Sequence, residues 1–109
     1  MLNIIRKLFS KTPKANVIIL GTDFEHYQLA EKLIKQGSYH IVAFIDEEPW
    51  NHKTQLHGAP LKYPSELIAL CKKYQVTEVI STHSQTLQLS EEQTIKLGEL
   101  GVKHRLAAN

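Results

Sequence analysis

The sequence predicts one α/β domain in which helices cover both faces of a parallel sheet. Residues 16–20 and 40–45 are short, mainly apolar runs, which is typical of strands buried on both faces. Other segments carry apolar residues three and four positions apart, as amphipathic helices do. Because the two patterns alternate along 109 residues, we expect a single three-layer domain that is too short to hold a further catalytic half.

The expected elements follow one another at short spacing. Pro64 suits a first helical position, and Ser90 with Gln93 has the spacing of a capping box. Pro60 favours an edge strand, since proline cannot donate to a strand ladder. In chain order we expect strand 16–20, helix 24–36, strand 40–45, strand 59–63, helix 64–74, strand 77–81, a helix ending at residue 100 and strand 102–106. Right-handed connections then give a sheet order of about 3-2-1-4-5.

Two of these helices carry packing expectations. Gly37 suits the left-handed position that ends helix 24–36. The apolar face of that helix is expected to consist of Phe24, Tyr27, Ala30, Leu33 and Ile34. In helix 64–74 the single cysteine, Cys71, is expected to be a packed core thiol beside Leu67, Ile68 and Tyr74, and a lone thiol fits a reducing cytoplasm.

A basic amphipathic segment, residues 1–14, precedes the domain, which we place at residues 15–109. It holds four Lys and Arg residues, so much of the net charge of +2 lies there and the domain body gives no case for nucleic-acid binding. No run approaches the roughly 20 apolar residues that span a bilayer, and charges interrupt any signal-like stretch. One interpretation is a weak contact of residues 1–12 with a membrane surface, which would make a cytoplasmic protein peripheral to the membrane. We favour a tail that lies against the domain.

The turn after the first strand keeps only part of a dinucleotide-binding fingerprint. In G-x-G-x-x-G the first glycine makes the turn, the second admits a pyrophosphate and the third lets the helix pack on the strand. Gly21 keeps the first position, but Asp23 and His26 occupy the second and third. Asp23 lies near the N-cap, where its carboxylate would accept the N–H bonds that otherwise hold a phosphate. We therefore expect the phosphate site to be filled by the protein's own carboxylate.

Acidic residues also follow the second strand. Asp46, Glu47 and Glu48, together with Asp23 and Glu25, would repel a phosphate-rich ligand by roughly 1 kcal/mol per close pair even in water. Asp46 stands where an acidic residue holds the ribose hydroxyl in such folds, or it begins a turn before the following proline; both interpretations stay open. NAD and other nucleotides are disfavoured, and NADP more strongly, because its 2′-phosphate would face carboxylates without a nearby Arg. The candidate ligand-binding residues are Gly21, Thr22, Asp23, Asp46 and Thr82.

Histidine and serine suggest metal or nucleophile chemistry only by composition. Of the six histidines, His26, His83 and either His52 or His57 fall in loops at the expected ligand crevice, but none has the close spacing of a metal motif. We therefore assign no metal site and expect His26 to make a contact at the start of its helix. A hydroxyl-rich stretch at residues 81–84 surrounds His83 without a third orienting group, so no catalytic residue is assigned.

Three local patterns carry a family resemblance. They are residues 17–21 (VIILG), residues 42–49 (VAFIDEEP), and residues 58–61 (GAPL) leading to 66–67 and 74–80. From residue 16 to residue 106 the chain resembles the Rossmann-like, CoA-binding-like domain that precedes the catalytic part of bacterial nucleotide-sugar epimerases and dehydratases of polysaccharide biosynthesis. The N-terminal domain of sugar acetyltransferases is similar too. The chain departs from this family in its glycine-poor first turn and in lacking the catalytic domain, so the resemblance implies a stand-alone accessory module with no catalytic residues to carry over.

The sequence therefore favours a non-catalytic ligand-binding or sensing module with a degenerate pyrophosphate site. Its partner would be a small polar or nucleoside-like molecule. One alternative is a protein-interaction module that binds no nucleotide. A small enzyme is the least favoured alternative, since no acid-base set is visible.

Overall fold

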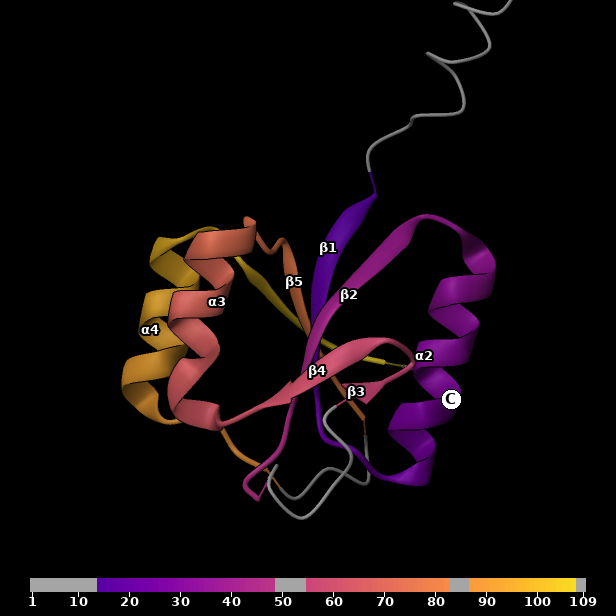
Figure 1. Ribbon diagram of the computed structural model, residues 1–109. Helices are drawn as coiled ribbons and strands as arrows, with labels where there is room; N and C mark the ends of the chain where they lie inside the picture. The colour runs from indigo at the N-terminus through magenta and orange to yellow at the C-terminus, as the bar shows by residue number, and fades with distance from the viewer. Residues whose placement is uncertain (1–13, 49–54, 83–86, 108–109) are drawn as a thin grey trace, which may run out of the picture.

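A computed structural model describes residues 14–48, 55–82 and 87–107. Its elements are β1 (Ala15–Leu20), α2 (Phe24–Gln36), β2 (Tyr39–Ile45), β3 (Gln55–Leu56), β4 (Ala59–Lys62), the 3-10 turn η2 (Pro64–Glu66), α3 (Leu67–Tyr74), β5 (Glu78–Ser81), α4 (Glu91–Glu99) and β6 (Lys103–Leu106). Figure 1 shows α2 on one side of the strands and α3 with α4 on the other. The predicted three-layer arrangement is confirmed.

The sheet runs in the order β3-β4-β2-β1-β5-β6. All neighbours from β4 to β6 pair in parallel, so the five parallel strands have the predicted order 3-2-1-4-5. β3 was not predicted from the sequence. It pairs antiparallel with β4 and forms the edge of the sheet in place of β4. Their two-residue turn, His57–Gly58, has φ values of 52° and 80°, and two positive φ angles are what the tight hairpin turn between twisted strands requires.

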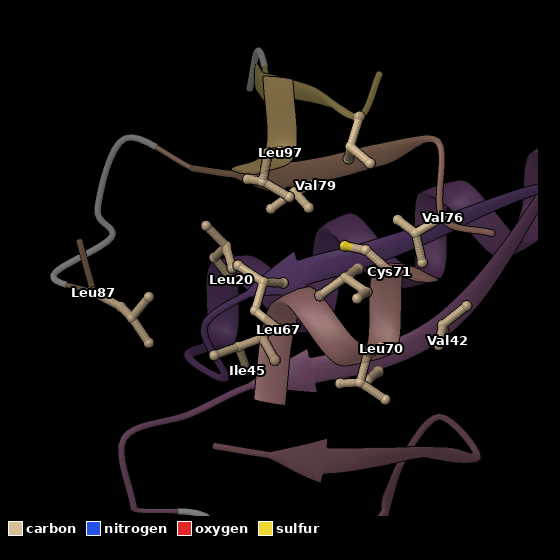
Figure 2. Close-up of a cluster of buried hydrophobic side chains, with 13 residues drawn as sticks. Leu20, Val42, Ile45, Leu67, Leu70, Cys71, Val76, Val79, Leu87 and Leu97 are labelled. Atoms are coloured by element: carbon tan, nitrogen blue, oxygen red, sulfur yellow. The ribbon is translucent and has the colours of Figure 1, made fainter. Parts of the chain in front are cut away.

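Two buried clusters fill the space between the sheet and the helices. In β1 the alternation of side chains sends Val17 and Ile19 toward α2, and Ile18 and Leu20 toward α3 and α4. Figure 2 shows the second cluster, in which the sulfur of Cys71 lies among aliphatic side chains. The predicted core thiol is confirmed, and burial raises the pKa of Cys71 to about 11. Tyr74, expected on the same face, is exposed instead.

A β-bulge interrupts the alternation in β2. Val17 pairs with Ile41 but Ile18 pairs with Ala43, which leaves Val42 as the extra residue. Val42 and Ala43 consequently both join the cluster under α3, while Ile41 and Phe44 join the one under α2. The bulge therefore sets which residues of β2 face each layer up to the end of the strand at Ile45.

The buried face of α2 differs from the expected one. Phe24 is 72% exposed and Ile34 46% exposed, so the predicted apolar stripe is wrong at these positions. The buried positions are His26, Ala30 and Leu33, which are spaced four and three residues apart. The helix is thus rotated so that His26 begins the face that packs on the sheet, while Phe24 and also Tyr27, which is 39% exposed, lie outside it.

The helix ends agree with the sequence prediction. Ser90 Oγ accepts from the Gln93 N–H at 3.0 Å while Gln93 Oε1 accepts from the Ser90 N–H at 3.0 Å, which confirms the capping box. Gly37 has a φ of 75° and ends α2 in the left-handed conformation. In the part of the chain that the structure describes, no helix is long and apolar enough to cross a bilayer. The predicted basic segment lies almost wholly outside the described residues.

Candidate functional site

The candidate site lies where β1 and β2 end and α2 begins. Leu20 and Ile45 are paired, and Gly21 N–H donates to the Ile45 carbonyl at 2.9 Å, so the segments after the two strands start side by side. Gly21 has a φ of 127°, which residues with a Cβ rarely adopt. This turn brings the chain into the N-cap of α2 at Asp23.

His26 fills the space above this turn. Its ring is only 1% exposed and lies at the third position of α2. A Cβ placed on Gly21 would come within 2.4–2.8 Å of three ring atoms of His26. The imidazole therefore fills the space between the start of α2 and the glycine turn, at the third fingerprint position, where a glycine lets the helix pack closely on the strand.

Both ring nitrogens of His26 have partners. Nδ1 accepts from the Asp23 N–H at 3.2 Å, and Nε2 lies 3.0 Å from Thr82 Oγ1 in a buried contact. Because Nδ1 acts as the acceptor, we assign the ring proton to Nε2, which then donates to the hydroxyl. The ring thus connects the start of α2 to the residue after β5, and the predicted contact at the helix start is confirmed.

This arrangement corrects the expected role of Asp23. Asp23 and His26 are placed as partners of a capping box, but the Asp23 carboxylate makes no cap hydrogen bond. The bond that forms runs from the Asp23 N–H to the imidazole. The first turn is thus filled by the ring of His26 and not by a carboxylate, because only the longer side chain reaches back over Gly21 to Thr82.

The electrostatic setting keeps His26 neutral. Burial lowers the pKa of His26, while the nearby Asp23 and Glu25 carboxylates raise it to a smaller extent. At neutral pH the ring is therefore polar but uncharged. It offers no cation with which to hold a phosphate.

Asp46 makes a local turn contact. Its Oδ1 accepts from the Glu48 N–H at 3.4 Å, and its backbone N–H donates to the Lys62 carbonyl at 2.9 Å. The first contact is that of a side chain beginning a turn, which was one of its two interpretations. Asp46 still stands after β2 next to the β1 turn, where a ribose hydroxyl would be recognised in this fold.

The structure brings the predicted site residues together unevenly. Gly21, Asp23 and Thr82 all meet the ring of His26. Thr22 follows Gly21 and is half-buried, and Asp46 directly follows β2, the strand that pairs with β1. His26 itself was expected only as a helix-start contact. Its position three residues after an N-cap aspartate, in the third fingerprint slot, was the signal that could have identified it.

The other described histidines have partners of their own, none of which is the ring of His26. His104 Nε2 lies 2.7 Å from Ser81 Oγ, and His40 Nδ1 lies 3.1 Å from Asn16 Oδ1 at the amino ends of the strands. His57 stacks on Tyr27, with ring centroids 4.2 Å apart. Among the described residues no group of three potential metal ligands is found. His52 and His83 lie outside the described ranges.

Comparison with known proteins supports the fold. No protein-family model and no curated protein sequence matches the chain. Among solved structures it is similar to UDP-D-quinovosamine 4-dehydrogenase from Vibrio fischeri, with a TM-score of 0.70 and 30% identity over 89% of this chain and 80% of that one. It is also similar to RSP, a Rex-family repressor, with a TM-score of 0.67 and 11% identity over 99% of this chain and 54% of that one.

RSP in complex with beta-NADH gives a TM-score of 0.65 at 12% identity, over 98% of this chain and 53% of that one. At this identity the likeness to RSP concerns the fold alone. The similarity to the Vibrio fischeri chain is higher in identity and covers most of both molecules. The protein belongs to the family of that chain, within the Rossmann-like nucleotide-binding fold.

Proposed function

We propose that this protein is a non-catalytic Rossmann-like module that binds or senses a small polar ligand at the carboxyl edge of its sheet. The ligand is nucleoside-like and lacks a pyrophosphate. The observation that carries the proposal is the buried imidazole of His26, which packs on Gly21 and fills the turn at the start of α2, the turn at which a dinucleotide fold binds its pyrophosphate. Thr22 and Asp46 border the same turn and offer the polar groups for a ligand.

The similarity to a UDP-sugar dehydrogenase supports a nucleotide-derived ligand. A UDP-sugar carries a pyrophosphate, so the absence of a pyrophosphate from the proposed ligand is inferred from the filled turn at His26 and not from that similarity. We place the protein with the Rossmann-like domains of bacterial nucleotide-sugar enzymes of polysaccharide biosynthesis, acting in the cytoplasm. The filled turn distinguishes it from a dinucleotide-binding domain. The carboxylates of Asp23 and Glu25 at the same helix start add repulsion toward phosphate.

Isothermal titration compares ligands with and without a pyrophosphate. Uridine and adenosine are measured against UDP-glucose and NAD on the full chain. We expect at least one nucleoside to bind below millimolar concentration and the pyrophosphate ligands to bind about tenfold more weakly or not at all, a difference of about 1.4 kcal/mol. Tighter binding of NAD than of adenosine would overturn the blocked turn, and no binding of any of the four would overturn the ligand role.

Restoring the glycine fingerprint tests the cause of this selection. In the double variant Asp23→Gly/His26→Gly the ring and the nearest carboxylate are both removed, so NAD should gain about tenfold or more in affinity. His40→Gly is the matched control, because His40 lies at the opposite end of the strands. Thermal unfolding of each variant checks that it is folded. An unchanged NAD affinity in the folded double variant would contradict the assigned role of His26.

A second candidate function is a protein-interaction module, favoured by the exposed side of α2. Phe24 is 72% exposed, and Tyr27 and Ile34 are partly exposed on the same helix. Aromatic and aliphatic groups gathered on one helix are typical of a docking surface. If no ligand binds, a double variant Phe24→Ser/Ile34→Ser that loses a partner retained by the wild type would identify this function.

A further inference from the structure

The contact between His26 and Asp23 tolerates only one protonation state. The Asp23 N–H is a donor and can do nothing else, so the 3.2 Å contact requires a free lone pair on Nδ1. When the neutral ring takes up a proton, that proton goes to Nδ1. Two N–H groups would then face each other at hydrogen-bond distance. The protonated ring therefore cannot remain in this position.

We propose that His26 is a proton-operated latch that joins the start of α2 to the turn at Gly21 and to Thr82 after β5. The neutral ring holds the first turn of α2 on the sheet, and protonation releases the ring and loosens that turn. This protonation-dependent release needs no bound ligand. Its test is therefore independent of whether the proposed ligand binds.

Carboxylates near the ring would stabilise the imidazolium once it leaves its buried position. On its own helix, Asp23 is exposed and Glu25 half-buried, and both carboxylates favour the imidazolium. From β1 the ring meets the uncharged Gly21, and from the end of β5 the uncharged hydroxyl of Thr82. The acidic residues after β2 are not among the charges that shift the pKa of His26. On release, the imidazolium would therefore move from a buried position without charged neighbours to a solvated position beside the carboxylates of Asp23 and Glu25.

Release of the ring affects a defined set of groups. The Asp23 N–H loses its acceptor, and the space against Gly21 is vacated. Ala30 and Leu33 stay packed further along the same face of α2, so loosening is confined to the first turn. The expected result is a local opening rather than loss of the fold.

NMR on the full-length protein tests the latch. Side-chain ¹⁵N shifts should show the proton on Nε2 of His26 at pH 8 and a titration midpoint below 6.5. Between pH 6.5 and that midpoint, amide exchange of Asp23 and Tyr27, whose N–H groups donate to His26 Nδ1 and to the Asp23 carbonyl, should speed up about tenfold per pH unit after correction for its intrinsic pH dependence. Amides of the central strands β1 and β5 serve as the internal reference.

Two variants isolate the residue. In His26→Gln the amide oxygen can accept from the Asp23 N–H, as Gln does in ordinary capping boxes, and it cannot titrate. This variant should lose the acid-induced opening. His40→Gln is the matched control and should keep it, because His40 contacts Asn16 far from α2's start.

Three results would overturn the proposal. They are a proton on Nδ1 of His26 at pH 8, an exchange rate of the Asp23 and Tyr27 amides that does not respond to pH in the wild type, and an unchanged pH response in folded His26→Gln. The first two need no variant, so the test holds even where the substitution unfolds the protein.

Discussion

At the scale of single residues, Gly21 and His26 form one unit. Gly21 is required both by its φ of 127° and by the ring that lies against it. A histidine is buried here because each ring nitrogen is satisfied and the neutral form is preferred. The two residues therefore constrain each other, and neither can be understood from its own position in the sequence.

The first prediction concerns Gly21→Ala. The alanine backbone would have to keep a disfavoured φ, and its Cβ would lie 2.4 Å from the imidazole. We therefore expect a loss of about 2–4 kcal/mol in the free energy of unfolding. Urea denaturation measures it. Gly98→Ala in α4 is the control, since a Cβ there meets nothing within 4 Å, and it should be neutral or slightly stabilising. Equal effects of the two substitutions would contradict the packing of His26 on Gly21.

The second prediction concerns the pH dependence of stability. The pKa of His26 in the folded state lies below its ordinary value of 6.5, so the unfolded chain binds the proton more readily. The contribution of His26 is then complete above pH 6.5 and is lost as the pH falls through the folded-state pKa. Urea unfolding from pH 8 to pH 5 should show a steeper decline in the wild type than in His26→Gln. A decline of the same slope in both proteins would show that other groups dominate.

At the scale of elements, two helices begin in different ways. α4 uses its N-cap side chain, with Ser90 Oγ accepting from the Gln93 N–H. α2 uses the side chain at its third position, with His26 accepting from the N-cap N–H, while the Asp23 carboxylate makes no cap hydrogen bond. The same capping-box spacing thus gives both reciprocal hydrogen bonds in α4 but only the bond to the third-position side chain in α2.

The third prediction follows from this contrast. Ser90→Ala should cost about 0.5–2 kcal/mol in the free energy of unfolding, the usual effect of removing an N-cap oxygen. Asp23→Ala should cost less, because the backbone N–H of residue 23 keeps its contact with His26. Thermal or urea denaturation of the two alanine variants under one condition compares them. A larger loss of stability for Asp23→Ala than for Ser90→Ala would show that the Asp23 carboxylate caps α2.

At the scale of the whole molecule, one sheet separates two buried clusters. Neighbouring residues of the same strands belong to different clusters, as Val17 and Ile18 do in β1. The strands therefore cannot leave one cluster without disturbing the other. This shared sheet is the physical reason to expect a single cooperative unfolding transition.

The fourth prediction tests that cooperativity. Leu33→Ala in α2 and Leu67→Ala in α3 lie in different clusters, and each should lower the free energy of unfolding by about 2–5 kcal/mol. Both should shift the same single transition, followed by far-UV circular dichroism. Ile95→Ala, 54% exposed on α4, is the control and should change little. Two separate transitions in either leucine variant would show that the clusters unfold independently.

The sequence by itself determined the order of strands and helices, the order of the parallel strands, and the capping box at Ser90. These features depend on local hydrophobic periodicity, on cap chemistry and on the handedness of connections, all of which are encoded within short segments. The edge hairpin at His57–Gly58 was also locally encoded by its glycine, but with two-residue β3 the pattern was too short to recognise.

Only the tertiary structure decided which face of α2 is buried and what fills the first turn. His26 lies four residues before Ala30 and seven before Leu33, so it has the spacing of the buried face, but the apolar pattern alone favours Phe24 over a polar histidine for burial. The burial of His26 depends on Thr82, which lies 56 residues away and satisfies the buried ring, and on the missing Cβ of Gly21. The candidate site was therefore located from the sequence, while the group that occupies it was fixed by contacts between distant segments.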